Sequence, residues 1–81
     1  MKIFALIWTD YEGDPAQVDL FSTWKLANEA MVKQVNTAIS KRLNIRCSED
    51  SNETRVILVD AADCYTALDE WRIEEKEIDG E

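Results

Sequence analysis

The C-terminal stretch from Asp69 to Glu81 mixes charged residues with large apolar ones, and it constrains the fold more than any other part of the chain. It contains seven carboxylates and two basic side chains, and Trp71, Ile73 and Ile78 lie among them. A disordered acidic tail has no use for three large apolar residues, whereas a folded element that turns one face to a core does. The stretch therefore predicts a folded element with a negatively charged outer surface.

Two conformations compete for this stretch. A helix would place several carboxylates at its C-terminal end, where the helix dipole disfavours negative charge. A strand from Trp71 to Ile78 avoids that cost. It turns Trp71 and Ile73 toward the core and points Arg72, Glu74 and Lys76 away from it. We predict an edge strand, whose charges would oppose edge-to-edge aggregation, and the helix remains the alternative.

Three further segments have the composition of strands. Residues Ile3–Trp8 form an unbroken apolar run, typical of a strand that is covered on both faces. Residues Gln17–Phe21 alternate in polarity after a turn-forming segment, which indicates a strand that pairs back as a hairpin. Residues Thr54–Val59 are rich in β-branched side chains. The polar segment Asn44–Glu53 is predicted to be a surface loop.

Residues between these strands have the periodicity of a helix. Ser22 and Thr23 are typical N-cap residues, and an amphipathic helix is predicted from there to about Leu43. Its apolar arc is expected to contain Trp24, Ala27, Met31, Val32, Val35, Ala38, Ile39 and Leu43. A short second helix is expected near residues 61–69, because Asp60 can cap it.

These elements predict one α+β domain over residues 1–81. Its order is ββαββ, with one long amphipathic helix packed on a mostly antiparallel sheet. Hydrophobic residues make up 46% of the chain, with three Trp, which is too many for a disordered protein even at a net charge of −8. A chain of this length is expected to form a single small core.

The N-terminal apolar run is too short for a secretory signal, and no stretch is long enough to span a membrane. Cys47 and Cys64 do not form a Cys-x-x-Cys pair, so neither a disulfide framework nor a zinc site is indicated. We therefore expect a cytoplasmic protein that does not bind membranes.

Several chemistries are excluded by the residue types that the chain lacks. It contains no His, so nucleophile activation of the Ser-His or Cys-His kind cannot be built. Gly13 and Gly80 are the only glycines, which excludes dinucleotide and Walker A phosphate loops. Asp10, Glu12 and Asp14 do not match the spacing of a calcium loop. We expect no enzyme activity, no cofactor and no metal.

The charge is distributed unevenly along the chain. Residues 22–48 have a net charge of +4, whereas residues 60–81 have a net charge of −7. The negative total disfavours direct binding of nucleic acid and favours a partner protein with a basic surface. The candidate partner-binding residues are Trp71, Glu74, Glu75, Glu77 and Asp79. Trp71 is included because its charged neighbours suggest partial exposure, and Trp is common in interface hot spots.

Parts of the chain resemble small proteins of a known kind. They are the lysine-led strand Met1–Trp8, the acidic turn Asp10–Asp14, the helix entry Phe21–Thr23 and the closing segment Ile73–Asp79. They resemble short uncharacterised acidic proteins of bacteriophages and other mobile elements, in which the C-terminal segment is usually a strand. That group includes anti-CRISPR and anti-restriction inhibitors. The resemblance has no diagnostic motif, and no functional residue is transferred from it.

The resemblance implies a non-catalytic inhibitor of host defence that acts in the host cytoplasm. Its partner would be a host protein, such as a nuclease complex that binds nucleic acid, and its acidic surface would compete for a groove that holds phosphates. The alternative is a small regulatory or accessory subunit, with a homodimer allowed. In that case the charge would serve only solubility.

Overall fold

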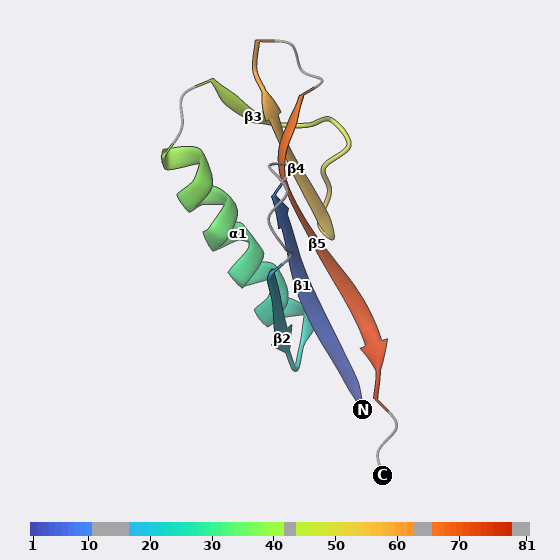
Figure 1. Cartoon of the computed structure of the whole chain (residues 1–81). Coiled ribbons are helices and arrows are strands. Elements are labelled where there is room, and N and C mark those ends of the chain that lie inside the picture. Colours follow the sequence, from blue (N-terminus) through green and yellow to red (C-terminus); the bar gives the residue numbers. More distant parts are fainter. Residues whose placement is uncertain (11–16, 42–43, 63–65, 79–81) are drawn as a thin grey trace.

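One antiparallel sheet of five strands and one helix make up the computed structural model (Figure 1). The structure describes residues 1–10, 17–41, 44–62 and 66–78. The elements are β1 (Lys2–Asp10), β2 (Gln17–Phe21), α1 (Trp24–Ser40), β3 (Ile45–Cys47), β4 (Arg55–Asp60) and β5 (Ala67–Glu77). The predicted α+β class and the helix-on-sheet arrangement are confirmed, with one strand more than expected.

The extra strand is β3, which lies in the segment predicted to be a surface loop. Ile45–Cys47 pairs antiparallel with β4, and Ile45 packs against the core. A segment of three residues is too short to show the alternation of polar and apolar side chains that predicts a strand. It is recognised as a strand only by its pairing with β4. Asn44 precedes β3 with a φ of 60°, a conformation that Asn tolerates better than most residues, and its carbonyl accepts a hydrogen bond from the Ala61 amide.

The strand order is β2-β1-β5-β4-β3, so β5 is the central strand. The prediction of a strand near Trp71–Ile78 is confirmed, but the prediction that it is an edge strand is wrong. The strand is longer than expected, and its N-terminal half pairs with β1 on one side and β4 on the other. The short helix expected at residues 61–69 is also wrong, since Ala67, Leu68 and Asp69 belong to β5. Residues 63–65 lie outside the described part.

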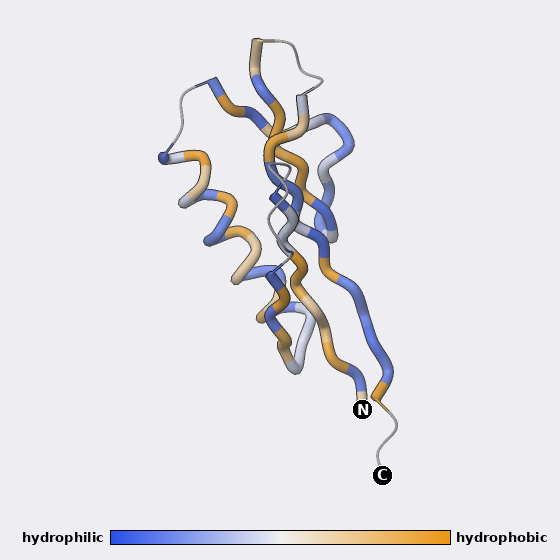
Figure 2. The backbone as a smooth tube through the Cα atoms, viewed as in Figure 1, coloured by the Kyte–Doolittle hydropathy of each residue, from blue (hydrophilic) through white to orange (hydrophobic). Residues whose placement is uncertain are grey.

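The last part of β5 extends beyond the rest of the sheet. The pairing of β4 with β5 ends at Arg55 opposite Arg72, whereas β1 and β5 stay paired as far as Lys2 opposite Glu77. In Figure 1 this two-stranded extension leads to the two chain ends. Phe4 still pairs with Phe21 of β2, so only Lys2 and Ile3 of β1 and their partners in β5 form the two-stranded part. Residues 74–77 of β5 are polar, whereas the paired residues 3–5 of β1 are apolar (Figure 2).

Helix α1 covers one face of the sheet with a narrow apolar stripe. Ala27, Met31 and Val35 are buried, as their spacing of four residues requires. The predicted apolar arc is too wide, because Trp24 and Val32 are exposed. The helix ends at Ser40, before the predicted Leu43, which lies outside the described residues.

The core lies between this helix and the middle of the sheet. Its buried centre is Leu6, Met31, Val35, Leu58 and Trp71, and partly buried Trp8, Phe21 and Ile73 pack around it. Side chains alternate along a strand, so Leu6 and Trp71 point to the helix while their neighbours point to the opposite face. The predicted orientation, with Trp71 and Ile73 toward the core and Arg72 and Lys76 away from it, is confirmed.

The helix start allows a direct test of the local structure. The Thr23 hydroxyl accepts a hydrogen bond from the Leu26 amide at 3.2 Å, and Thr23 has an extended backbone, as an N-cap residue should. We expect Thr23→Ala to reduce the free energy of unfolding by about 1 kcal/mol, measured by urea denaturation. The matched control is Ser22→Ala, which should change it much less. Equal losses for both variants would contradict the cap assignment.

Candidate functional site

Trp71 does not lie on the surface. Its side chain is 3% exposed, and its indole Nε1 donates a hydrogen bond to Gln34 Oε1 at 3.1 Å. The expectation that Trp71 stays partly exposed is therefore wrong. The charged residues beside it in the sequence point to the other face of the sheet, because neighbouring side chains on a strand alternate. Trp71 joins β5 to the helix, and a rigid partner protein could not reach it.

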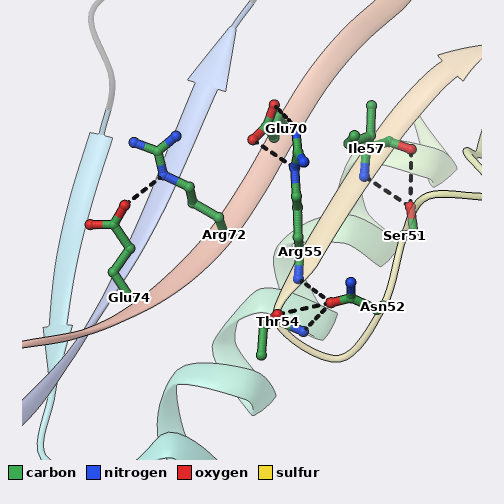
Figure 3. A network of polar contacts seen from close by, with 8 residues as sticks. All are labelled: Ser51, Asn52, Thr54, Arg55, Ile57, Glu70, Arg72 and Glu74. Carbon is green, nitrogen blue, oxygen red and sulfur yellow. Dashed lines mark hydrogen bonds and ion pairs between the residues drawn. The ribbon is translucent and has the colours of Figure 1, made fainter.

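The predicted acidic residues of β5 are paired with nearby cations. Glu74 lies 3.1 Å from Arg72 and 3.3 Å from Lys76, and Figure 3 shows the contact with Arg72. Glu75 lies 3.7 Å from Lys2, and Glu77 lies 3.7 Å from the N-terminal ammonium of Met1. Exposed ion pairs of this kind each contribute only about 0–1 kcal/mol to stability.

The ion pairs change the electrostatic character of the strand. The cations that offset Glu75 and Glu77 come from the start of the chain, which the antiparallel pairing of β1 with β5 brings alongside. Glu74 points to the face opposite the helix, whereas Glu75 and Glu77 share the Trp71 face beyond the core, as predicted. Glu74, Glu75 and Glu77 thus lie on two faces of the sheet, and each of them is beside a cation. Asp79 lies outside the described residues.

A partly buried ion pair between β4 and β5 is of a different kind. The Arg55 guanidinium donates from Nε to Glu70 at 3.1 Å and from Nη2 at 3.4 Å, and the Glu70 side chain is largely buried (Figure 3). Two parallel hydrogen bonds from a planar guanidinium are stronger and more specific than a single contact. This pair fixes β4 against β5.

A second set of carboxylates lies in the loop before β4. Glu49, Asp50 and Glu53 are exposed, and within the described part of the chain no ion pair involves any of them. We call these three residues the loop carboxylates. They lie in the segment predicted to be a surface loop. Their field is not offset by an ion pair with a described cation.

Hydrogen bonds hold this loop against β4. Asn52 Oδ1 accepts from the Thr54 amide at 2.8 Å and from the Arg55 amide at 3.1 Å, and the Ile57 amide donates to Ser51 Oγ at 3.0 Å (Figure 3). The Asn28 side chain donates to the Glu53 carbonyl at 3.1 Å, which attaches the loop to the helix. The loop backbone that carries these carboxylates is therefore attached to both β4 and the helix.

The face of the sheet opposite the helix carries two rows of side chains across the strands. Pairing places Val18, Ile7 and Arg72 in one row, and Leu20, Ala5 and Glu74 in the next. Val18 is 53% exposed and Leu20 is 63% exposed, although both belong to a strand. We call this side of the sheet the open face, because no described helix packs on it.

A cavity of about 560 Å³ lies between the helix and the strands β1 and β5. Trp8 donates a hydrogen bond from Nε1 to Asp69 Oδ1 at 3.2 Å, and Asp69 is buried. Together with the bond between Trp71 and Gln34, this contact fixes both indole rings in the cavity wall. The lining residues are Trp8, Gln17, Lys33, Gln34, Thr37, Ala38, Lys41, Asp69 and Trp71.

Two further observations concern ligand chemistry and membranes. Among the described residues, no group of three or more Cys, Asp or Glu side chains is arranged to hold a metal ion. The helix of the described part is too short and too polar to cross a membrane.

Comparisons with known proteins gave no match for this chain. No protein-family model matches it, and no significant match is found among curated proteins or among solved structures.

Proposed function

We propose that this chain is a non-catalytic protein-binding domain that associates with a partner protein carrying a basic surface. The observation that supports this proposal is the net charge of −8 on a domain of 81 residues. Such a field speeds the encounter with a cationic surface and repels nucleic acid. Within this class, the resemblance to small phage proteins favours an inhibitor of a host nuclease complex.

The ion pairs change which carboxylates a basic partner can bind most easily. A partner that binds Glu74, Glu75 and Glu77 must first displace Arg72, Lys76, Lys2 or the N-terminal ammonium. The loop carboxylates need no such exchange. Two triple variants with the same change in net charge therefore separate the two surfaces. One carries Glu74→Lys, Glu75→Lys and Glu77→Lys, and the other carries Glu49→Lys, Asp50→Lys and Glu53→Lys.

We expect the loop variant to lower the association rate with a basic partner by at least about tenfold, and the strand variant to lower it less. The partner is first captured on the immobilised chain from a bacterial lysate and identified by mass spectrometry. Association is then measured with the purified partner by surface plasmon resonance. Equal losses in both variants would show that only the total charge matters, whereas unchanged binding in both would contradict the proposal.

The ionic strength gives an independent check of the same proposal. Screening lengths fall from about 10 Å at 0.1 M salt to about 3 Å at 1 M salt. Binding that is driven by charge must weaken over this range, and binding that persists would show an apolar contact instead. The inhibitor role is tested separately, by expressing the chain in bacteria whose CRISPR or restriction system blocks a phage. Plating efficiency should rise, and it should rise less with the loop variant.

A further inference from the structure

We propose that the cavity between α1 and the strands β1 and β5 binds a small aromatic anion, that is, a planar ring system that carries a carboxylate. This inference goes beyond the proposed function, because it assigns a small-molecule ligand to a site that a basic partner protein does not need. It depends on three features of the cavity, namely its size, its aromatic wall and the charge of its accessible polar groups.

The cavity has the size of a binding site for a small molecule. Its volume of about 560 Å³ lies within the range of about 300–1,000 Å³ that is typical of ligand pockets. Strand pairing places Gln17 opposite Trp8, and Trp8 opposite Trp71, so these three residues form one row across the sheet. The second half of α1 supplies the other wall. A site that lies between a sheet and a packed helix is preformed, which lowers the entropic cost of binding.

The aromatic wall offers a ligand carbon surface instead of hydrogen bonds. The indole N–H of Trp8 is already bonded to Asp69 at 3.2 Å, and the indole N–H of Trp71 is already bonded to the helix. Trp71 is 3% exposed and forms the floor of the cavity, whereas Trp8 is only half-buried. A flat ring of the ligand therefore packs mainly against the Trp8 indole, and aromatic pairs of this kind attract each other.

Gln34 has an amide donor available beside this wall. The indole of Trp71 can only donate, so the oxygen of the Gln34 amide must be the atom that faces it. The Gln34 nitrogen Nε2 keeps two N–H groups, and no hydrogen bond to another described residue uses them. A carboxylate on the ligand can accept from this amide, and hydrogen bonds to a charged acceptor are stronger than neutral ones.

The charged groups that a ligand can reach in the cavity are cations. Lys33 and Lys41 line it from the same side of α1, about 12 Å apart along the helix axis. Both are exposed, and neither makes an ion pair with another described residue. Among the described residues that line the cavity, the one carboxylate belongs to Asp69, which is 1% exposed and bonded to Trp8. Asp10, its neighbour on β1, does not line the cavity.

Two effects oppose the binding of an anion, and the two lysines outweigh them. The C-terminal end of α1 carries only about half an elementary negative charge. The net charge of −8 repels anions at long range, but salt at 0.15 M screens this repulsion beyond about 8 Å. An aromatic cation would instead meet two ammonium groups, while the carboxylate of Asp69 is buried beneath the surface that it could reach.

The probe for this site is 2-naphthoate, and the neutral 2-naphthamide has the same rings without the charge. Nuclear magnetic resonance of the ¹⁵N-labelled chain at 0.15 M salt follows the indole N–H signals of its three Trp, which single Trp→Phe variants assign. Naphthoate should move the Trp8 signal most and the Trp71 signal less, with a Kd at or below about 1 mM. The Trp24 signal should stay in place, because Trp24 lies about 14 Å before Lys33 along the helix. Naphthamide should bind about fivefold more weakly.

A double variant separates the effect of charge from the effect of packing. Lys33→Gln with Lys41→Gln should weaken naphthoate binding about fivefold and leave naphthamide binding unchanged. The matched control, Lys25→Gln with Arg46→Gln, removes the same charge at exposed positions that do not line the cavity, and it should bind naphthoate as the parent does. Trp8→Leu should weaken the binding of both probes. Circular dichroism and urea denaturation confirm that each variant is folded.

A Trp8 signal that does not move at 10 mM naphthoate overturns the inference. An equal movement of the Trp24 signal also overturns it, since the probe would then bind without selecting the cavity. Equal affinities for naphthoate and naphthamide, or a lysine double variant that binds naphthoate like the parent, overturn the assignment of an anion. No other protein is present in these titrations, so their failure is distinct from a failure of the proposed function.

Discussion

Trp71→Ala is expected to reduce the free energy of unfolding by about 3–5 kcal/mol, the range for removing a buried Trp from a core. Trp71 lies on the central strand and contacts the helix through Gln34. The substitution removes the indole ring and leaves the Gln34 Oε1 atom without this donor, which adds a desolvation cost. A small domain is stable by only about 5–15 kcal/mol, so this variant should unfold at much lower urea concentrations.

The control for this substitution is Trp24→Ala, since Trp24 is 36% exposed at the start of the helix. It removes the same side chain from a partly exposed site and should cost far less. Urea denaturation followed by circular dichroism measures both. If Trp71→Ala lost partner binding while its unfolding midpoint stayed at the parent value, Trp71 would be an exposed contact residue and its packing between β5 and α1 would be wrong.

Leu6→Ala is expected to reduce the free energy of unfolding by about 3–5 kcal/mol, through lost burial and the cavity that it leaves. Leu6 is 1% exposed, and it lies on β1 between β2 and β5 under the helix residues Met31 and Val35. Its neighbours belong to different elements of the sheet and helix, so they cannot easily move together to fill the space that the Leu6 side chain leaves. The loss should appear as a lower urea midpoint.

Leu26→Ala is the matched control, because the same side chain is 46% exposed on the helix. Ala is also a slightly better helix former than Leu, so the change should be close to neutral. A small effect of Leu6→Ala would mean that the helix does not pack on this part of the sheet. A large effect of Leu26→Ala would mean that another surface covers the helix.

Local patterns in the sequence were sufficient to predict the elements that are long and regular. The strand at Ile3–Trp8, the hairpin with Gln17–Phe21 and the cap at Thr23 follow from residue type and spacing, and all three are present. The strand near Trp71 was predicted by the cost of placing carboxylates at a helix end. These are properties of neighbouring residues, which the sequence displays directly.

Local patterns could not predict the conformation of segments that become strands only by pairing with another strand. Ile45–Cys47 is a strand because β4 supplies its hydrogen bonds, and Ala67–Asp69 continue β5 because Ala67 pairs with β4 and Asp69 pairs with both β4 and β1. The periodicity of residues 61–69 favours a helix when it is considered alone. Pairing with the neighbouring strands outweighs that local preference.

The acidic C-terminal stretch shows the same division most clearly. Its sequence determined that it is folded, that it is a strand and that Trp71 and Ile73 face the core, because alternation along a strand is a local property. Only the tertiary structure decided how its charge is presented. Lys2 and the Met1 ammonium come from the opposite end of the chain, and they lie beside Glu75 and Glu77 because β1 and β5 pair antiparallel. Electrostatic energy depends on distance in space, so a charge count along the sequence could not reveal this compensation.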